Sequence, residues 1–183
     1  MDNGESSYRR FLAGDSEGML EIVCAYRTGL ILYLNSFVQN IHTAEELTED
    51  TFLELMIKRP EYSKKSSFKT WLYAIGRNIT TKYLRKHIRI SVVPLESQEF
   101  LADEESIEGK YIISEQQRMV HQALHKLKLK YRQVLYLSYF EGFSNSEAAY
   151  IMKKSDKQIT DLLYNARKAL RTELERSGFK YEN

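Results

Sequence analysis

The sequence is poor in the residues that cross-link a chain or turn it sharply. It has 1 Cys, 2 Pro and 8 Gly in 183 residues. The single Cys24 excludes an internal disulfide framework and a multi-cysteine metal site, and it is typical of a reducing compartment. Leu, Lys, Glu and Arg are abundant by contrast, and they favour helices over turn-rich β structure. We therefore expect an all-α protein.

Long apolar runs are also lacking. No apolar segment follows a basic start, and no window approaches the roughly 18 apolar residues that a membrane span needs. We therefore expect a cytoplasmic protein without a signal peptide or a membrane span.

The usual signatures of catalysis are lacking too. The sequence has neither a Gly-rich phosphate loop nor an HExxH metal helix. His121 and His125 would give a metal only two ligands, and we interpret them as surface histidines. Cys24 lies in an apolar helical pattern and is interpreted as a small core residue rather than a nucleophile. We predict a protein that is not an enzyme and that holds no metal or cofactor.

Charge is nearly balanced overall, with a net charge of +2, but it is unevenly distributed. Residues 1–57 carry 3 Lys/Arg against 10 Asp/Glu, whereas residues 58–89 carry 10 against 1. Residues 90–109 carry 6 acids and no Lys/Arg, and residues 110–183 carry 14 Lys/Arg against 8 acids. Such blocks are consistent with solvated faces, but basic blocks on amphipathic helices favour nucleic-acid binding.

Helical periodicity dominates the first 60 residues. Asp15 is the predicted N-cap of a long helix that continues to Phe37. Thr43 and Glu46 have the form of a capping box and predict a second helix, which ends before Pro60. Its pattern places Leu47, Phe52, Leu55 and Met56 inward and Glu45, Glu46, Glu49, Asp50 and Glu54 largely outward.

Residues 66–86 combine an apolar helical spine with a basic, aromatic-bearing outer face. Phe68, Trp71, Leu72, Ile75 and Ile79 recur at helical spacing and predict a core-facing side. The other positions suit a nucleic-acid backbone and unstacked bases, and they include Lys69, Tyr73, Arg77, Asn78, Lys82, Arg85 and Lys86.

Residues 90–109 lack sustained periodicity and are interpreted as an acidic linker. Helical spacing returns at Ile112, and a further helix is predicted over about residues 130–141. Two capping boxes then follow each other, Ser144 with Glu147 and Ser155 with Gln158. A short helix, a tight turn and a second capped helix predict a helix-turn-helix, although any antiparallel helix pair shares these features.

Three segments resemble, in order, the extracytoplasmic-function class of bacterial sigma factors. These segments are AEELTEDTF at 44–52, SFKTWLYAIGRN at 67–78, and YFEGFSNSEAAYIM at 139–152 followed by SDKQITDLLYNARKAL. The resemblance implies two small helical domains, region 2 at 1–89 and region 4 at 110–183, joined by the acidic linker at 90–109. It implies a factor that directs RNA polymerase to promoters and assists promoter melting.

The resemblance also implies partners and roles for individual residues. The partners are core RNA polymerase, through the clamp helices of its β′ subunit and its β flap, promoter DNA and an anti-sigma factor. The residues that it implies in polymerase binding are Glu46, Glu49, Asp50, Leu53 and Glu54. Binding of the −10 element falls on Tyr62, Lys64, Lys65, Ser67, Lys69, Arg77, Asn78 and Arg85. Binding of the −35 element falls on Lys154, Ser155, Lys157, Gln158, Tyr164, Asn165, Arg167 and Lys168.

The proposed recognition helix departs from the family's pattern. Thr160 stands where Lys is common, Leu162 stands where Arg is common, and Asp156 and Asp161 add negative charge. Lys153 replaces a turn glycine, which costs about 1 kcal/mol if the backbone is left-handed there. We expect weakened −35 binding. Two alternatives stay open, a standalone helix-turn-helix regulator and a sigma-like interaction protein that no longer melts DNA.

Overall fold

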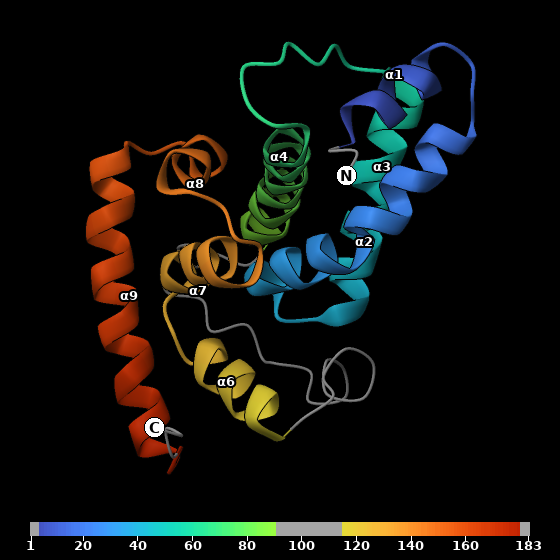
Figure 1. Ribbon diagram of the computed structural model, residues 1–183. Helices are drawn as coiled ribbons and strands as arrows, with labels where there is room; N and C mark the ends of the chain where they lie inside the picture. The colour runs from blue at the N-terminus through green and yellow to red at the C-terminus, as the bar shows by residue number, and fades with distance from the viewer. Residues whose placement is uncertain (1–3, 91–114, 180–183) are drawn as a thin grey trace.

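The computed structural model describes residues 4–90 and 115–179, and these ranges form helices without any strand. The N-terminal unit contains α1 (Glu5–Leu12), α2 (Glu17–Val38), α3 (Ile41–Lys58) and α4 (Phe68–Ile90). The C-terminal unit contains α6 (Glu115–His125), α7 (Leu129–Leu135), the π-helix η1 (Tyr136–Phe140), α8 (Asn145–Met152) and α9 (Asp156–Arg176) (Figure 1). The all-α prediction is confirmed. The predicted linker at 90–109 lies outside the described residues, apart from Ile90 at the end of α4.

Local signals predict the approximate starts of α2 and α3, with two corrections to the cap residues. The prediction that Thr43 caps α3 is wrong, because α3 begins earlier and Asn40 caps it by accepting a hydrogen bond from the Thr43 backbone N–H at 2.9 Å. The prediction that Asp15 is the N-cap of α2 is wrong by one residue, because Ser16 occupies that position, although the Asp15 side chain does accept from the Glu17 N–H at 3.0 Å. α3 ends at Lys58, followed by a left-handed Arg59 before Pro60.

The N-terminal unit packs α2 between α1 and α3, with α4 crossing both α2 and α3. Gly18 permits the closest approach, since a Cβ there would lie 2.1 Å from the Ser7 carbonyl oxygen of α1. The predicted spine of α4 is buried at Phe68 and Leu72. Two inward predictions are wrong: Met56 is 44% exposed, and Cys24 is exposed. Both lie at the edge of their apolar stripe, where periodicity does not fix which side is covered.

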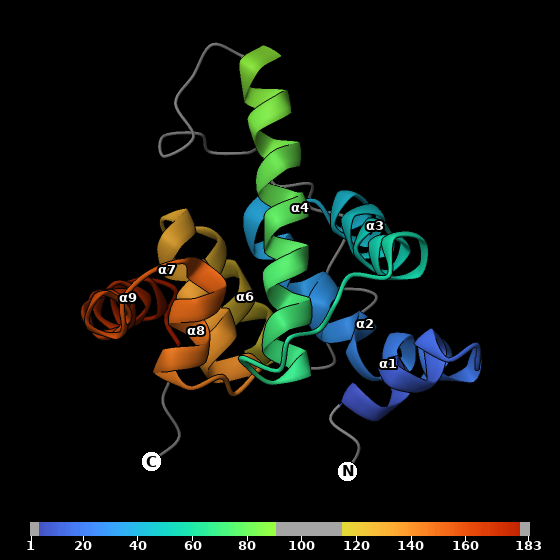
Figure 2. The same cartoon turned by 90° about the horizontal axis from the view of Figure 1, so that it is seen from above.

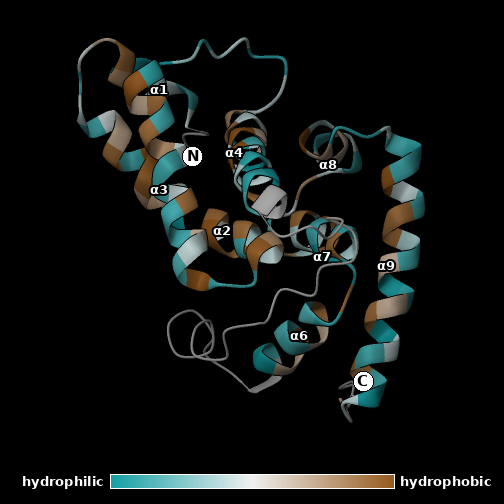
Figure 3. Ribbon diagram, turned by 180° about the vertical axis from the view of Figure 1, so that it is seen from behind, coloured by the Kyte–Doolittle hydropathy of each residue, from teal (hydrophilic) through white to brown (hydrophobic). Residues whose placement is uncertain are grey.

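The C-terminal unit arranges α6, α7 and α8 against the long α9. The single helix predicted over residues 130–141 is α7 continued by η1. A π-helical turn widens the hydrogen-bonding step from four residues to five, and such turns are frequent at functional sites. Figure 3 shows hydrophilic and hydrophobic residues alternating along α9, which is the pattern of a helix with one covered face.

The two units pack directly on each other. α4 contacts α8, and α2 contacts α7 and η1, so that α4 lies between α3 and α8 (Figure 2). The buried residues of both units form one continuous hydrophobic cluster. Across the parts of the chain that the structure describes, no helix is both long and apolar enough to span a membrane.

A buried arginine ties the units together. Arg132 of α7 is only 6% exposed, and its Nε donates to the Ser36 carbonyl of α2 at 2.9 Å. Its Nη1 donates to the carbonyls of His125 and Leu127 at 2.9 and 2.8 Å. The Gln39 amide of α2 reaches the same His125 carbonyl at 2.9 Å. Both the Nε and the Nη1 atoms of this guanidinium therefore donate to backbone carbonyl oxygens.

The prediction that His121 and His125 lie on the surface is wrong. His121 is 8% exposed, and its Nδ1 lies 2.5 Å from the Tyr136 hydroxyl. The Nε2 atom of His125 is also buried. The His121 ring packs against Tyr136 and Phe140 of η1, and the His125 carbonyl accepts a bond from Arg132 of α7, because the short loop after α6 brings α7 and η1 back against α6. No group of three or more metal-ligating side chains occurs in the described ranges, 4–90 and 115–179.

Candidate nucleic-acid interface

α8 and α9 form a doubly capped helix pair. The Ser144 hydroxyl accepts from the Glu147 N–H at 3.3 Å while the Glu147 carboxylate accepts from the Ser144 N–H at 3.0 Å. Ser155 and Gln158 exchange the equivalent bonds at 3.2 and 2.9 Å. Both predicted capping boxes are confirmed. The turn between the helices places Lys153 at φ 55° and ψ 50°, the left-handed conformation that a lysine adopts at a cost of about 1 kcal/mol.

Side-chain bonds fix the angle between α8 and α9. The Ser146 hydroxyl donates to the Asp156 carboxylate at 2.6 Å, and the Asn145 amide donates to the Thr160 hydroxyl at 3.2 Å. Asp156 and Thr160 are two of the departures from the family's pattern. Both hold the helix pair together, so their side chains have a structural task in this chain. Leu162, a third departure, is 9% exposed and packs inward.

The outer face of α9 carries the cations, amides and phenol expected of a groove-reading helix. Tyr164 is 71% exposed, and the Asn165 amide donates to the Asp161 carbonyl at 2.8 Å. All predicted −35 contacts are exposed, and they are Lys154, Ser155, Lys157, Gln158, Tyr164, Asn165, Arg167 and Lys168. Ser155 and Gln158 use part of their hydrogen-bonding capacity in the cap. The principal cations on the α9 face are Lys157, Arg167 and Lys168.

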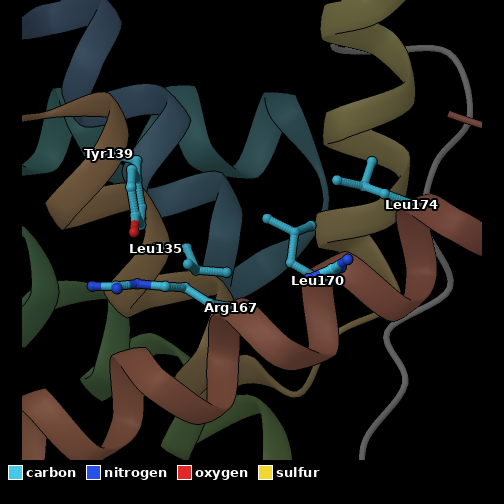
Figure 4. Close-up of a pocket in the computed structure, with 6 residues that line it drawn as sticks. Leu135, Tyr139, Arg167, Leu170 and Leu174 are labelled. Atoms are coloured by element: carbon cyan, nitrogen blue, oxygen red, sulfur yellow. The ribbon is translucent and has the colours of Figure 1, made fainter. Parts of the chain in front are cut away.

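A hollow of about 420 Å³ lies between α9 and the segment formed by α7 and η1. Figure 4 shows Leu170 and Leu174 of α9 beside it and Arg167 extending toward Tyr139. The Arg167 guanidinium carbon lies 5.7 Å from the centre of the Tyr139 ring. This cation–π contact holds Arg167 at the edge of the α9 face rather than leaving it fully mobile.

A second surface lies on the outer side of α3. Glu46, Glu49 and Asp50 are exposed, and Leu53 is 46% exposed beside them. Glu54 is less exposed and forms an ion pair with Lys58, with 2.9 Å between Lys58 Nζ and Glu54 Oε2. Ile57 is 76% exposed next to this acidic face. An acidic helix with an apolar centre suits a partner surface that is basic at its rim.

The loop from residue 62 to 67 leads into the third surface. The Tyr62 hydroxyl donates to the Ser66 carbonyl at 2.6 Å, and its ring packs 5.2 Å from the Trp71 ring. Lys64 adopts a left-handed conformation and pairs with Glu5. Lys65 and Ser67 are exposed here, as is Arg85 far along α4. This loop is therefore anchored by Tyr62 and presents its cations outward.

The middle of α4 is not a free surface. The prediction that Tyr73 faces solvent is wrong, because it is fully buried and its hydroxyl donates to the Glu141 carboxylate at 2.7 Å. Burial, reinforced by the negative charge of Glu141, raises the pKa of Tyr73 far above its ordinary value, so the phenol stays protonated. Lys69 is also bound to Glu141. Arg77 and Asn78 are half-buried, and the Arg77 Nε atom is fully covered.

Comparison with known proteins matches both units to one family. Residues 22–90 match Sigma-70 region 2, and residues 117–170 match Sigma-70, region 4. Together the matches cover about two thirds of the chain, in the order that the motifs predicted. The chain belongs to the extracytoplasmic-function sigma factors. As a member, this sigma factor is a promoter-specificity subunit for RNA polymerase in transcription initiation, and it binds core polymerase and promoter DNA.

Related sigma factors align with this one over most of its length. It is 25% identical over 170 residues to ECF RNA polymerase sigma factor SigW of Bacillus subtilis, covering 88% of this chain and 91% of that protein. It is 27% identical over 164 residues to SigM of the same organism, covering 82% and 91%.

Solved structures share the fold of this sigma factor. The sigma factor RpoE in complex with the anti-sigma factor NepR, from Bartonella quintana, aligns with a TM-score of 0.70 and 24% identity, over 85% of this chain and 95% of that one. CnrH in complex with the cytosolic domain of CnrY aligns with a TM-score of 0.67 and 19% identity, over 96% and 99%.

Sequence reasoning missed the residues that join the two units of the sigma factor. Glu141, Glu147 and Arg132 all bridge them, yet only Glu147 carried a local signal, its capping box. Glu141 and Arg132 lie in an otherwise apolar stretch, YRQVLYLSYFEGF. A charged residue inside such a stretch is the one feature that could have indicated a buried partner.

Proposed function

We propose that three separate surfaces of the sigma factor divide promoter recognition, with the domain boundaries at 1–89, 90–109 and 110–183. The C-terminal unit reads the −35 element as duplex DNA. The N-terminal unit docks on core polymerase through α3 and holds the −10 element through the 62–67 loop and α4. The chemistry of RNA synthesis belongs to the polymerase, and this chain contributes binding.

The observation that supports this proposal best is the outer face of α9. It is the second helix of a doubly capped helix-turn-helix, and every proposed contact on it is exposed. Such a helix enters the major groove. The face holds fewer cations than the family's pattern, and each lost phosphate contact lowers both affinity and its salt dependence. We propose that −35 binding is accordingly weak and needs the polymerase to add its own contacts.

For the −10 element, the sigma factor must keep bases of one strand out of the duplex. Unstacking a base costs a few kcal/mol, and stacking it on an aromatic ring or seating it in a pocket returns about 1–3 kcal/mol. We propose that the 62–67 loop captures such bases and assists melting. Lys64, Lys65 and Arg85 are the exposed cations that would hold the strand. Ser67, Lys69, Arg77 and Asn78 complete the surface.

For polymerase binding, we propose that Leu53 and Ile57 form the apolar centre of the contact and that Glu46, Glu49, Asp50 and Glu54 form its rim. This arrangement suits the clamp helices of the β′ subunit, while the β flap would meet the C-terminal unit. The RpoE relative was solved with an anti-sigma factor. We propose an anti-sigma partner for this sigma factor as well, because the two chains share their fold over 85% of this chain.

Run-off transcription tests the function directly. The sigma factor is mixed with core polymerase and a library of genomic fragments, and we expect specific transcripts that core polymerase alone does not produce. A standalone regulator or a sigma-like interaction protein would give none, so their absence over a wide range of salt and temperature refutes the proposal.

Variants separate the surfaces. Arg77→Ala with Asn78→Ala should impair open-complex formation and leave polymerase binding near normal, whereas Ile57→Asp should weaken polymerase binding. Lys126→Ala, a change at an exposed lysine outside all three surfaces, is the control. Loss of polymerase binding in the first variant would assign α4 to docking.

A further inference from the structure

We propose that this sigma factor inhibits itself: Glu141 and Glu147 of the C-terminal unit occupy the part of α4 that binds the −10 element, and the two units must separate before promoter melting. The inference rests on the proposed function, since it requires the α4 face to bind DNA.

Glu141 binds Lys69, the central cation of that face. Lys69 Nζ lies 2.9 Å from Glu141 Oε2 and donates to the Glu141 carbonyl at 2.8 Å. The same Oε2 atom accepts from the Tyr73 hydroxyl at 2.7 Å. The side chains of Lys69 and Glu141 are 31% and 12% exposed, so the pair is well shielded from water. A DNA phosphate offers the same acceptor chemistry as this carboxylate, and the two cannot occupy one ammonium group together.

Glu147 binds the hydroxyl groups of Ser67 and Thr70 at the start of α4. Its Oε1 atom accepts from the Thr70 hydroxyl at 2.9 Å and from the Ser67 hydroxyl at 3.2 Å. Its Oε2 atom remains in the capping box of α8. Burial alone would raise the pKa of Glu147, but the hydrogen bonds from Ser144, Thr70 and Ser67 outweigh it and hold that pKa below its usual value. The carboxylate is thus ionised when it faces α4.

An aromatic contact also covers this part of α4. The Phe143 ring meets Tyr73 edge-on, with 5.0 Å between centroids, and Lys69 Nζ lies 4.8 Å from the Phe143 centroid. Phe143 is only 6% exposed. A nucleotide that approached Lys69 from this covered side would have to displace the Phe143 ring.

α2 also accommodates the closed arrangement, through Gly29. A Cβ at Gly29 would lie 2.5 Å from the Tyr73 hydroxyl and 2.6 Å from Glu141 Oε1. Glycine inside a helix costs about 1 kcal/mol relative to alanine. The absence of a side chain at Gly29 is what lets the Tyr73–Glu141 pair rest against α2.

Closure also carries a cost, which keeps it reversible. Among the described residues, buried polar atoms without a protein hydrogen-bond partner include Tyr33 OH, both side-chain polar atoms of Asn35, Arg77 Nε and Ser138 Oγ. They belong to α2, α4 and η1, elements of the two units that meet. Each such atom costs about 1–3 kcal/mol compared with its hydrated state. Separation of the units would return water to those at the interface, which offsets part of the cost of exposing the apolar contacts there.

The test uses the full-length protein and measures closure and DNA binding separately. Closure is followed by energy transfer between dyes on Cys24, the only cysteine and an exposed one, and on a Ser177→Cys substitution at the end of α9. DNA binding is followed by fluorescence anisotropy with a random-sequence single-stranded DNA of about 12 nucleotides, in the absence of polymerase. Glu141→Lys breaks the ion pair with Lys69. Gly29→Ala opens the same contact sterically without changing charge.

Both variants should lower energy transfer and tighten DNA binding, by about tenfold if the open form rises from one tenth of the molecules to nearly all. Glu175→Lys makes the same charge change on α9 and is the control. It should leave energy transfer unchanged, and its DNA affinity measures the gain that the added positive charge alone gives to Glu141→Lys. Lys69→Glu combined with Glu141→Lys should restore energy transfer.

Unchanged energy transfer in both openers would overturn the closed contact. Lower transfer with unchanged DNA affinity would overturn inhibition and would show that the failure lies in the −10 role of α4. Helical circular dichroism confirms that each variant is folded before its result is counted.

Discussion

His125 makes the stability of this protein depend on pH in a calculable way. It ends α6, and its carbonyl accepts from Arg132 of α7 within the same unit and from Gln39 at the end of α2, so that the Gln39 bond joins the two units. Its Nε2 atom is buried without a hydrogen-bond partner in the part of the chain that the structure describes. Burial, with smaller contributions from the charges of Arg132 and His121, lowers the pKa of His125 to about 4. The imidazole is therefore neutral in the folded protein at neutral pH.

The direction of the effect follows from proton linkage. In the unfolded chain the pKa of His125 is about 6.5, so between pH 6.5 and 4 the unfolded state binds a proton that the folded state does not. Its stabilising contribution is thus complete above pH 6.5 and is lost as pH falls through that window. Between pH 7 and pH 5 the loss is about 2 kcal/mol. Burial also lowers the pKa of His121, which acts in the same direction.

Urea unfolding at pH 7.0 and pH 5.0 measures this loss. The free energy of unfolding of the wild-type protein should fall by about 2 kcal/mol or more over this interval. His125→Gln should remove most of the fall, because glutamine does not titrate. His42→Gln is the matched control, since the His42 side chain is 76% exposed. An equal fall in the wild-type and His125→Gln proteins would refute the linkage argument.

Three further substitutions test local geometry by the same unfolding measurement. Gly18→Ala should destabilise by about 2 kcal/mol, because its Cβ would lie 2.1 Å from the Ser7 carbonyl oxygen and α1 must shift; no loss would show that α1 is loosely held. Lys153→Gly should stabilise by about 1 kcal/mol by relieving the left-handed lysine, whereas Lys153→Ala should not. Arg132→Met should cost about 3 kcal/mol, since three carbonyl oxygens lose their donor; a loss below about 1 kcal/mol would contradict the bridging role.

Local signals in the sequence were sufficient to predict the helices and the helix-turn-helix. Ser144 and Ser155 each precede an acceptor side chain by three residues, and both form the capping boxes that this spacing predicts. Such signals succeed because both partners lie within one helical turn. Thr43 carried the same signal and failed, since Asn40 upstream caps the helix instead.

Contacts between the two units could not be predicted in this way. Tyr73 occupies the polar side of the α4 pattern, and its burial depends on Glu141 and Phe143, which are about 70 residues away in the sequence. His125 likewise looks like a surface residue until α7 folds back over it. Periodicity shows which side of a helix is more apolar, but it does not show whether a second unit covers the other side.

The double use of Glu147 has a consequence for genetics. One carboxylate oxygen starts α8 and the other holds α4, so a substitution at Glu147 would release the units and weaken the helix-turn-helix together. Glu141 is the C-cap residue of η1, but that cap uses its backbone N–H and not its carboxylate. In a selection for cells whose target promoters stay active without an inducing signal, surviving mutations should therefore accumulate at Glu141 and Gly29 and avoid Glu147. The position of such mutations along the chain would report which contacts restrain the protein and which build it.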